Sequence, residues 1–433
     1  GGGRGRMLRP ASAGVNRAMG PLWRRPRPAR TMHRSAVEWQ AAFAASRRGD
    51  QKLLKAVKSV ARNGNFGEFE LLRRLTEACG VPGREEQVRE LVLAETRGLW
   101  DEMRIDAMGN LICLKRATRG AAAARGRSAP RGATKPPAGR AERVMLACHM
   151  DEIGFYVRYI DEQGHLRIQN AGGFDTRNLF ARRVRVGGRR ELIGVLNPSG
   201  RPIHMASEEE KKKIPEIKDF YVDLFMPKAQ VEKLVEVGDP VTLLQTTEMI
   251  GDAICGKAMD NRVALWVGIN AVRQVFGDRA RKGPGSRYDV YFVACTQEEV
   301  GLRGATTAAY SIDPDIGVAI DTTLCCDTPG ISRDDAVTEF GKGVGVKVMD
   351  GASISHRGLF EEFVGIARKR KIRHQLEVLP RGGTDAGAVQ RTRGGTRSIT
   401  LSVPTRYIHT VTEAIHKDDA RAAVSLLAAW LSA

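Results

Sequence analysis

Residues 144–155 read VMLACHMDEIGF, an apolar run that ends in a histidine and, two positions later, an aspartate. A short apolar run bounded in this way predicts a strand buried on both faces, as in a parallel sheet. Three further runs share this character: YDVYFVAC at 288–295, IGVAI at 316–320 and SITLSV at 398–403. Apolar residues at helical spacing lie between them, at 262–276 and 359–369. We therefore expect an α/β fold with a mostly parallel sheet flanked by helices.

Residues 152–246 follow a different pattern. Short segments of alternating polarity are separated by glycine turns, as in FYVRYIDEQGHLRIQ at 155–169, and there is hardly a helical pattern. This alternation is typical of a small, barrel-like β-domain. We expect it to be inserted into an α/β domain that spans 38–151 and 247–433.

The formal net charge of +19 is concentrated in two segments of low complexity. Residues 1–37 hold nine Arg and no acid, and residues 116–143 hold eight Lys or Arg against one Glu. Neither segment has the composition of a folded face with interleaved aromatics, which a nucleic-acid platform needs. We therefore do not expect nucleic acid as a partner. The Ala, Gly, Arg and Pro content of 116–143 predicts a disordered basic loop. Because it joins one predicted strand to the next, we expect an enlarged turn at a sheet edge.

The leader, residues 1–37, has the composition of a transit peptide: rich in Arg, Ala and Pro and free of acid. We expect it to be disordered and to direct the chain to the mitochondrion or chloroplast; without such an address the chain would be cytoplasmic. The seven cysteines form no C-x-x-C pair, which is typical of free thiols in a reducing compartment. No apolar stretch reaches the ~20 residues that cross a bilayer, so no membrane association is expected.

Titratable residues stand at the ends of the predicted strands. Five follow the first three runs: His149, Asp151, Glu298, Glu299 and Asp321. Because the carboxyl ends of parallel strands line one crevice, these side chains should lie close together. Asp260 precedes a helical run, where an N-capping carboxylate would reach the same rim, and His409 follows the fourth strand.

Each of these residues alone has an ordinary structural explanation. An aspartate before a helix is usually a cap, an aspartate at a strand end commonly closes a turn, and a single histidine is more often packed than a ligand. Together, two histidines and several carboxylates without a cysteine match an oxygen-rich site for one or two divalent transition metals. Two metals held by a bridging carboxylate activate water for hydrolysis.

The order of the segments around these residues resembles the M42 metallo-aminopeptidases, over about residues 65–433. Seven segments carry the resemblance: ACHMDEIGF (147–155), GKAMDNR (256–262), TQEEVGLRGA (296–305), AIDTT (319–323), GKGVGVKVMDG (341–351), GGTDAGAVQRTRGG (382–395) and VPTRYIHT (403–410). The chain departs from the family pattern at Asn261, where a second aspartate is often found. That difference removes no expected ligand.

The resemblance implies a role for each residue. Asp260 would bridge two zinc or cobalt ions, His149 and Asp321 would complete one site, and Glu299 and His409 the other. Glu298 would be the general base that moves a proton from water to the leaving amine, and Asp151 would accept the ring N–H of His149. Thr384 and Asp385, in the glycine-rich run, are expected to contact substrate, with a structural turn as the alternative.

The resemblance also implies what the chain binds. We expect short peptides, cleaved from the N-terminus, and a homo-oligomer: a dimer formed through the inserted β-domain, which in the family assembles into a tetrahedral dodecamer. Two alternatives remain. A deacylase on the same scaffold would need the same metals but no free substrate amine. A non-catalytic scaffold that recruits partners through its basic arms would be expected to lose ligands or the base, and both are present.

Overall fold

The computed structural model describes residues 66–119, 140–277 and 282–433. All of them belong to one unit, Gly64–Ala433. The predicted leader, 1–37, and most of the predicted basic loop lie outside the described residues.

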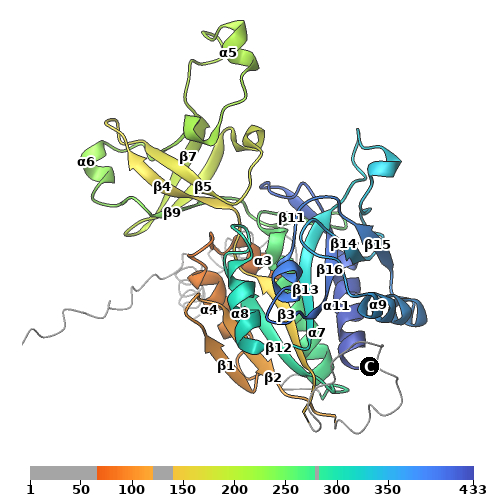
Figure 1. Cartoon of the computed structure of the whole chain (residues 1–433). Coiled ribbons are helices and arrows are strands. Elements are labelled where there is room, and N and C mark those ends of the chain that lie inside the picture. Colours follow the sequence, from red (N-terminus) through yellow and green to blue (C-terminus); the bar gives the residue numbers. More distant parts are fainter. Residues whose placement is uncertain (1–65, 120–139, 278–281) are drawn as a thin grey trace, which may run out of the picture. The chain divides into compact units, whose positions relative to one another are not determined.

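An eleven-stranded mixed sheet forms the centre of this unit (Figure 1). Nine strands follow in spatial order: β1 (Glu102–Ile105), β2 (Leu111–Lys115), β12 (Asp289–Cys295), β3 (Arg143–His149), β13 (Ile316–Leu324), β16 (Arg397–Arg406), β17 (Glu413–His416), β11 (Ala253–Gly256) and β10 (Glu248–Ile250). Off this path, β14 (Val344–Met349) pairs with β16 and with β15 (His374–Val378). The four central strands β12, β3, β13 and β16 are parallel. The predicted α/β class is confirmed. The sheet is mixed and only partly parallel, not mostly parallel as predicted, because antiparallel pairs flank the four central strands.

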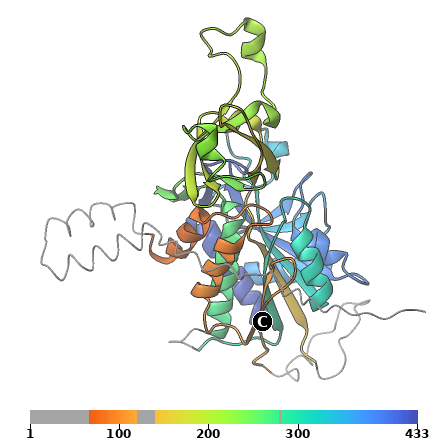
Figure 2. The same cartoon turned by 90° about the vertical axis from the view of Figure 1, so that its left-hand side faces the viewer.

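Helices cover both faces of the sheet, as the view turned by 90° shows (Figure 2). One face packs against five helices: α3 (Glu70–Glu77), α4 (Glu86–Glu95), α7 (Met259–Phe276), α9 (Arg357–Arg370) and α11 (Lys417–Leu431). The other face packs against α8 (Arg303–Ile312) and α10 (Asp385–Gln390). In β3, Val144 and Leu146 enter the first core and Met145 the second. A strand in contact with two cores must be apolar at every position, which explains the continuous run.

The basic segment 116–143 joins β2 to β3, but these two strands are not neighbours. β12 pairs with both of them, so it lies between them. The segment is therefore not a turn at a sheet edge as predicted, because the strands on either side of it are separated by β12, which comes later in the chain.

The predicted inserted β-domain is a closed six-stranded barrel. Around the barrel the strands run β4 (Gly154–Ile160), β5 (Leu166–Ala171), β8 (Phe220–Asp223), β7 (Glu191–Pro198), β6 (Arg182–Gly187) and β9 (Pro240–Leu243). Alternate residues such as Phe155 and Val157 fill its own core, which explains the period of two in the sequence. The short helix α5 (Glu208–Lys212) stands at the tip of an arm that extends from the barrel (Figure 1).

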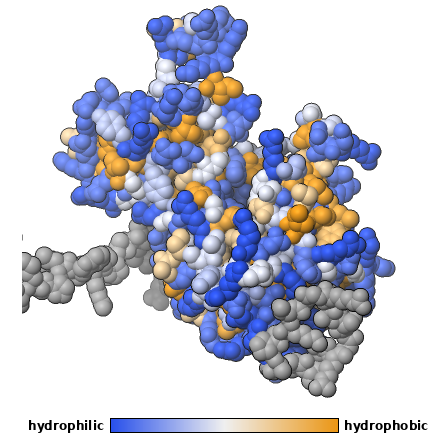
Figure 3. Space-filling view, in the orientation of Figure 1, coloured by the Kyte–Doolittle hydropathy of each residue, from blue (hydrophilic) through white to orange (hydrophobic). Residues whose placement is uncertain are grey.

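The remaining short helices lie in connections: η1 (Gly67–Phe69), η3 (Thr176–Leu179), η4 (Ile217–Asp219), α6 (Lys228–Val231) and η5 (Arg333–Asp335). No helix within the described ranges is long and apolar enough to cross a membrane. The face seen in the space-filling view is largely hydrophilic, with hydrophobic residues in separate groups (Figure 3). The seven cysteines are free thiols.

Candidate metal centre

The strand register opens a space at the carboxyl ends of β3 and β13. The ladder between these strands stops at Ala147 opposite Ala319, whereas β13 stays paired with β16 as far as Leu324. His149 and Asp321 each lie two residues beyond the last pair, so both point to the same face of the sheet. Divergence of the two strands thus creates room between these side chains.

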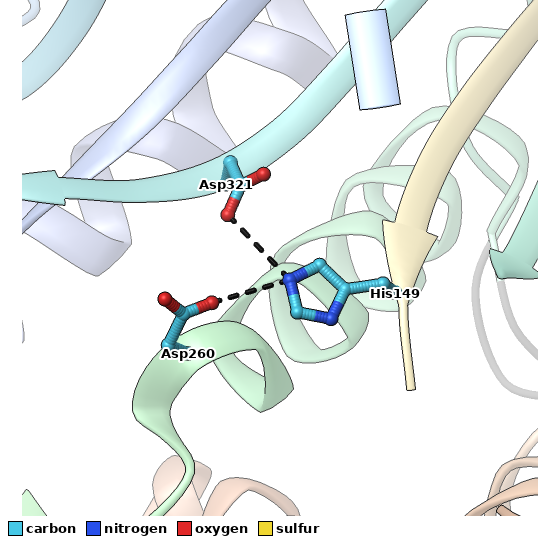
Figure 4. Close-up of side chains that lie close together, drawn as sticks. All are labelled: His149, Asp260 and Asp321. Carbon is cyan, nitrogen blue, oxygen red and sulfur yellow. Dashed lines mark ion pairs between the residues drawn. The ribbon is translucent and has the colours of Figure 1, made fainter. Parts of the chain in front are cut away.

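His149, Asp260 and Asp321 form the first of two clusters at this point (Figure 4). His149 Nε2 lies 3.2 Å from Asp260 Oδ1 and 3.8 Å from Asp321 Oδ1. His149 is 1% exposed and Asp321 5%. Three potential ligand atoms therefore converge from β3, β13 and the start of α7.

The second cluster shares Asp260 with the first. His409 Nε2 lies 3.5 Å from Asp260 Oδ2 and 3.4 Å from Glu299 Oε2. In each cluster the potential ligand atoms all lie within 4.8 Å of one another. The structure thus brings all five predicted ligands together, and one carboxylate faces both histidines with different oxygens.

Asp260 does not cap α7 as the sequence suggested. The N-cap of α7 is Ala258, and Asp260 and Asn261 have non-helical backbone angles within the assigned helix. The side chain of Asn261 donates to the carbonyl of Ile320 in β13, at 3.0 Å. The carboxylate of Asp260 is therefore free to face the histidines instead of the helix amides.

A comparison with models of protein families identifies the family of this chain. The model described as M42 glutamyl aminopeptidase matches residues 132–426, and a second one, described as AMPT, matches residues 68–91. The chain belongs to the M42 glutamyl aminopeptidase family. As a member, it is a metal-dependent aminopeptidase, a hydrolase of the exopeptidase class, as predicted.

Relatives of this M42 aminopeptidase match it over nearly their whole length. A lysyl aminopeptidase from Pyrococcus furiosus is 30% identical over 84% of this chain and 96% of its own. The structure of an aminopeptidase from the archaeon Desulfurococcus kamchatkensis is 33% identical, with a TM-score of 0.74 over 84% of this chain and 94% of its own. The Pyrococcus horikoshii TET1 peptidase, which can assemble into a tetrahedron or a large octahedral shell, is 28% identical over 84% of this chain and 99% of its own, with a TM-score of 0.69.

The M42 site concentrates negative charge in the protein interior. Burial raises the pKa of Glu298 and of Asp321 well above the ordinary range, although the charge of His149 opposes it in both cases. Burial lowers the pKa of His409, but hydrogen bonds with Asp260 and Glu299 outweigh it and raise the pKa to about 12. Buried carboxyl groups at this density stay ionised only if positive charge lies beside them.

Divalent cations fit this donor set. Glu299 Oε1 is buried without a hydrogen-bond partner in the described structure, while its other oxygen faces His409. Imidazole nitrogens and carboxylate oxygens, without cysteine, are the ligands of zinc and of similar divalent metals. An unpaired, buried ligand oxygen beside a shared carboxylate therefore suits two cations.

Glu298 lies beside both clusters but belongs to neither. Its Oε2 is 3.9 Å from His149 Nε2, and its side chain is 11% exposed. It is placed on the segment that follows β12, next to the ligand candidate Glu299. A carboxylate there can exchange a proton with a molecule held in the site.

Asp151 contacts the ring of His149 from the side away from the cluster. His149 Nδ1 lies 3.2 Å from the backbone carbonyl of Asp151 and 3.5 Å from its carboxylate. The backbone carbonyl of Asp151 is thus the closer acceptor for this ring nitrogen. Because a carbonyl only accepts, a ring protonated at Nδ1 leaves the Nε2 lone pair directed at Asp260 and Asp321.

Thr384 and Asp385 lie in the interior at the start of α10, each 2% exposed. Thr384 is hydrogen-bonded to Thr400 at 2.8 Å, and it donates to Asp350 at 3.3 Å. Burial raises the pKa of Asp385 to about 6. These positions give neither side chain a solvent-facing surface, and their contact with substrate stays a prediction.

Two carboxylates near the site escaped the sequence analysis. Glu85, 3% exposed, accepts the backbone N–H of Gln297, and Glu413, 2% exposed, accepts those of Asp260 and His409. In sequence, Glu85 resembles an acidic first turn of α4, and Glu413 is one polar residue in a short strand. The signal that could have identified them is a carboxylate at a position where the spacing of the apolar residues predicts a buried side chain.

Proposed function

We propose that this M42 enzyme removes residues from the N-terminus of short peptides, with the two clusters as a pair of metal sites. The observation that carries the proposal is the position of Asp260, whose two oxygens face His149 and His409 separately. A bridging carboxylate of this kind is what two metals ~3.5–4 Å apart require.

The proposal assigns the ligands by cluster. His149 and Asp321 hold one ion, Glu299 and His409 hold the other, and Asp260 is shared between them. Zinc and cobalt suit these donors equally well. When bound, the ions supply Lewis acidity and lower the pKa of water towards neutrality.

Glu298 moves the proton in this proposal. It is close to both clusters without belonging to either, so its carboxylate keeps an oxygen for proton transfer. It takes a proton from the attacking water and gives it to the nitrogen of the leaving amine. The backbone N–H of Glu298 is anchored on Asp151, which keeps this segment in place.

Selection for the N-terminal residue follows from its free amine. In its neutral form this amine could coordinate one of the bound ions, and in its charged form it could pair with a nearby carboxylate that is not a ligand. An internal or acylated nitrogen is an amide and offers neither interaction. We therefore propose a free-amine substrate; a deacylase on the same scaffold would act on N-acylated amino acids.

The first experiment measures hydrolysis of aminoacyl p-nitroanilides, including lysyl, glutamyl and leucyl derivatives, with N-acetylated counterparts. The purified chain is treated with chelator and then reloaded with zinc or cobalt, beside Glu298→Gln. We expect cleavage of free-amine substrates that returns with metal and that Glu298→Gln reduces by at least about a hundredfold. Cleavage of N-acetylated substrates alone would establish the deacylase, and full activity in Glu298→Gln would contradict the assigned base.

We also propose a homo-oligomer, by similarity to the Pyrococcus horikoshii TET1 peptidase. The barrel is the proposed dimerisation surface, and twelve subunits the proposed assembly. Analytical ultracentrifugation of the chain distinguishes a monomer, a dimer and a dodecamer. A monomer at micromolar concentration would contradict this proposal and leave the chemistry unaffected.

A further inference from the structure

Glu413 connects the backbones of two proposed ligands that come from different parts of the chain. It begins β17 and is 2% exposed. One carboxylate oxygen accepts the backbone N–H of His409 at 2.7 Å, and the other accepts that of Asp260 at 3.0 Å. One buried side chain thus spans both segments.

The sheet topology explains why this position reaches both ligands. β17 lies between β16 and β11. The end of β16 leads to His409, and the end of β11, where Gly256 pairs with Glu413, leads to Asp260. A side chain at the start of β17 therefore sits between the two segments as they leave the sheet.

Both ligand segments have an irregular backbone, so their amides need a hydrogen-bond acceptor that is not part of a regular helix or β-ladder. His409 has a left-handed backbone with φ of 63°, and Asp260 has φ of −78° and ψ of 101° within α7. A buried N–H without an acceptor is costly, and a left-handed non-glycine residue persists only where its surroundings hold it. Glu413 satisfies both amides at once.

We propose that Glu413 is a positioning residue that fixes the spacing between Asp260 and His409 and thereby sets the affinity for the metal ion that these two residues share with Glu299. The inference rests on the proposed metal site and deepens it. Glu413 itself belongs to neither metal cluster, and each of its oxygens accepts a backbone amide.

The chemistry of the side chain gives the inference a sharp test. A carboxylate offers an acceptor on each oxygen, whereas glutamine offers one oxygen and one NH₂ donor. In Glu413→Gln, one of the two ligand amides must therefore face a donor, and its segment must move. Glu413→Asp keeps both acceptors but is one methylene shorter, so it cannot reach both amides without a shift.

A merely structural role predicts a different result, and Asp419 supplies the matched control. This buried carboxylate accepts the backbone N–H of Gly341 with one oxygen and that of Gly343 with the other, both at 2.7 Å. Neither glycine belongs to a metal cluster. Asp419→Asn therefore removes the same kind of interaction without touching a ligand segment.

The experiment titrates the chelator-treated full chain with zinc against a chromophoric chelator, and with cobalt while its d–d absorption is recorded. Thermal melting and circular dichroism confirm folding. In wild type we expect two ions per chain. In Glu413→Gln we expect affinity for one ion to fall about ten- to a hundredfold, with a changed cobalt spectrum. Glu413→Asp should show a smaller loss, and Asp419→Asn should lower the melting temperature while keeping both affinities.

Two results would overturn the inference alone: wild-type affinities in both Glu413 variants, or an equal loss of metal in Asp419→Asn. A wild-type chain that binds no metal would overturn the proposed function together with it. Because the titration reads metal binding directly, it does not depend on which peptide the enzyme prefers.

Discussion

The carboxylate of Asp151 accepts the backbone N–H of Glu298 at 3.1 Å, and its second oxygen accepts that of Glu299 at 3.0 Å. The backbone carbonyl of Asp151 lies 3.2 Å from the ring of His149. A single residue therefore orients a proposed ligand on β3 and holds the segment that carries the proposed base.

Replacing Asp151 should impair turnover more than binding of substrate. In Asp151→Asn one of the two amides loses its acceptor, and we expect kcat to fall about ten- to a hundredfold with a small change in KM. Steady-state kinetics at saturating zinc measure this. Asp419→Asn is the control for the loss of a buried carboxylate, and an unchanged kcat in Asp151→Asn would contradict the assigned role.

Replacing Glu85 should make stability less sensitive to pH. Burial and the negative charge of Asp151 raise the pKa of Glu85 from 4.5 to about 7. The contribution of its neutral form to stability is complete below pH 4.5 and is lost as the pH rises through 7. Glutamine stays neutral, and the single oxygen that accepts from Gly83 and Gln297 is retained.

We therefore expect the metal-free Glu85→Gln variant to gain stability relative to wild type between pH 5 and pH 8, measured by urea unfolding. The exposed neighbour Glu86 supplies the control, Glu86→Gln, for which no such gain is expected. A difference between Glu85→Gln and wild type that stays constant with pH would show that Glu85 is ionised throughout this range.

Removing metal should lower the melting temperature. Ions that bind only the folded chain stabilise it by about 2.7 kcal/mol when present at ~100 times their dissociation constant. We expect chelator to remove this stabilisation and zinc or cobalt to restore it, in a thermal melt. A His149→Ala, His409→Ala double variant should melt at the same temperature with and without chelator.

The buried pair of Lys347 and Glu377 should be essential for stability. Both side chains are fully buried, with Nζ 2.9 Å from Oε1. Lys347→Met removes the cation from the carboxylate of Glu377 and from that of Asp350, which lies 3.7 Å from Nζ, and should cost about 3–5 kcal/mol in urea unfolding. Glu377→Gln in the same chain should restore much of the loss. The exposed pair of Arg357 and Glu361 is the control, since Arg357→Ala should cost less than about 1 kcal/mol.

The strand-end residues of the site could be predicted because their position follows from local pattern. An apolar run marks where β3 or β13 ends, and parallel neighbours bring those ends together, so His149 and Asp321 follow from the sequence. The contacts of Glu85 and Glu413 could not be predicted in this way. They accept hydrogen bonds from backbone amides of segments far away in the chain. Almost every residue type has such an amide, so the sequence does not show which one needs an acceptor.

The same limit explains the errors. The helical pattern around Asp260 is genuine, but the contact of Asn261 with β13 overrides it at the first turn. The sequence of 116–143 predicts a turn at a sheet edge, because nothing in it shows that β12 lies between the two strands that it connects. The order of strands in a sheet also depends on strands that come later in the chain, so the sequence of one connection cannot reveal it.

The barrel is inserted between His149 and Asp260, and the remaining proposed ligands follow as far as His409. During synthesis, the ribosome therefore releases one proposed ligand, then a whole domain, and only afterwards the other four. A chain that stops within or directly after the barrel holds one proposed ligand of the five. This order delays assembly of the proposed metal centre until the segments on both sides of the barrel have been made.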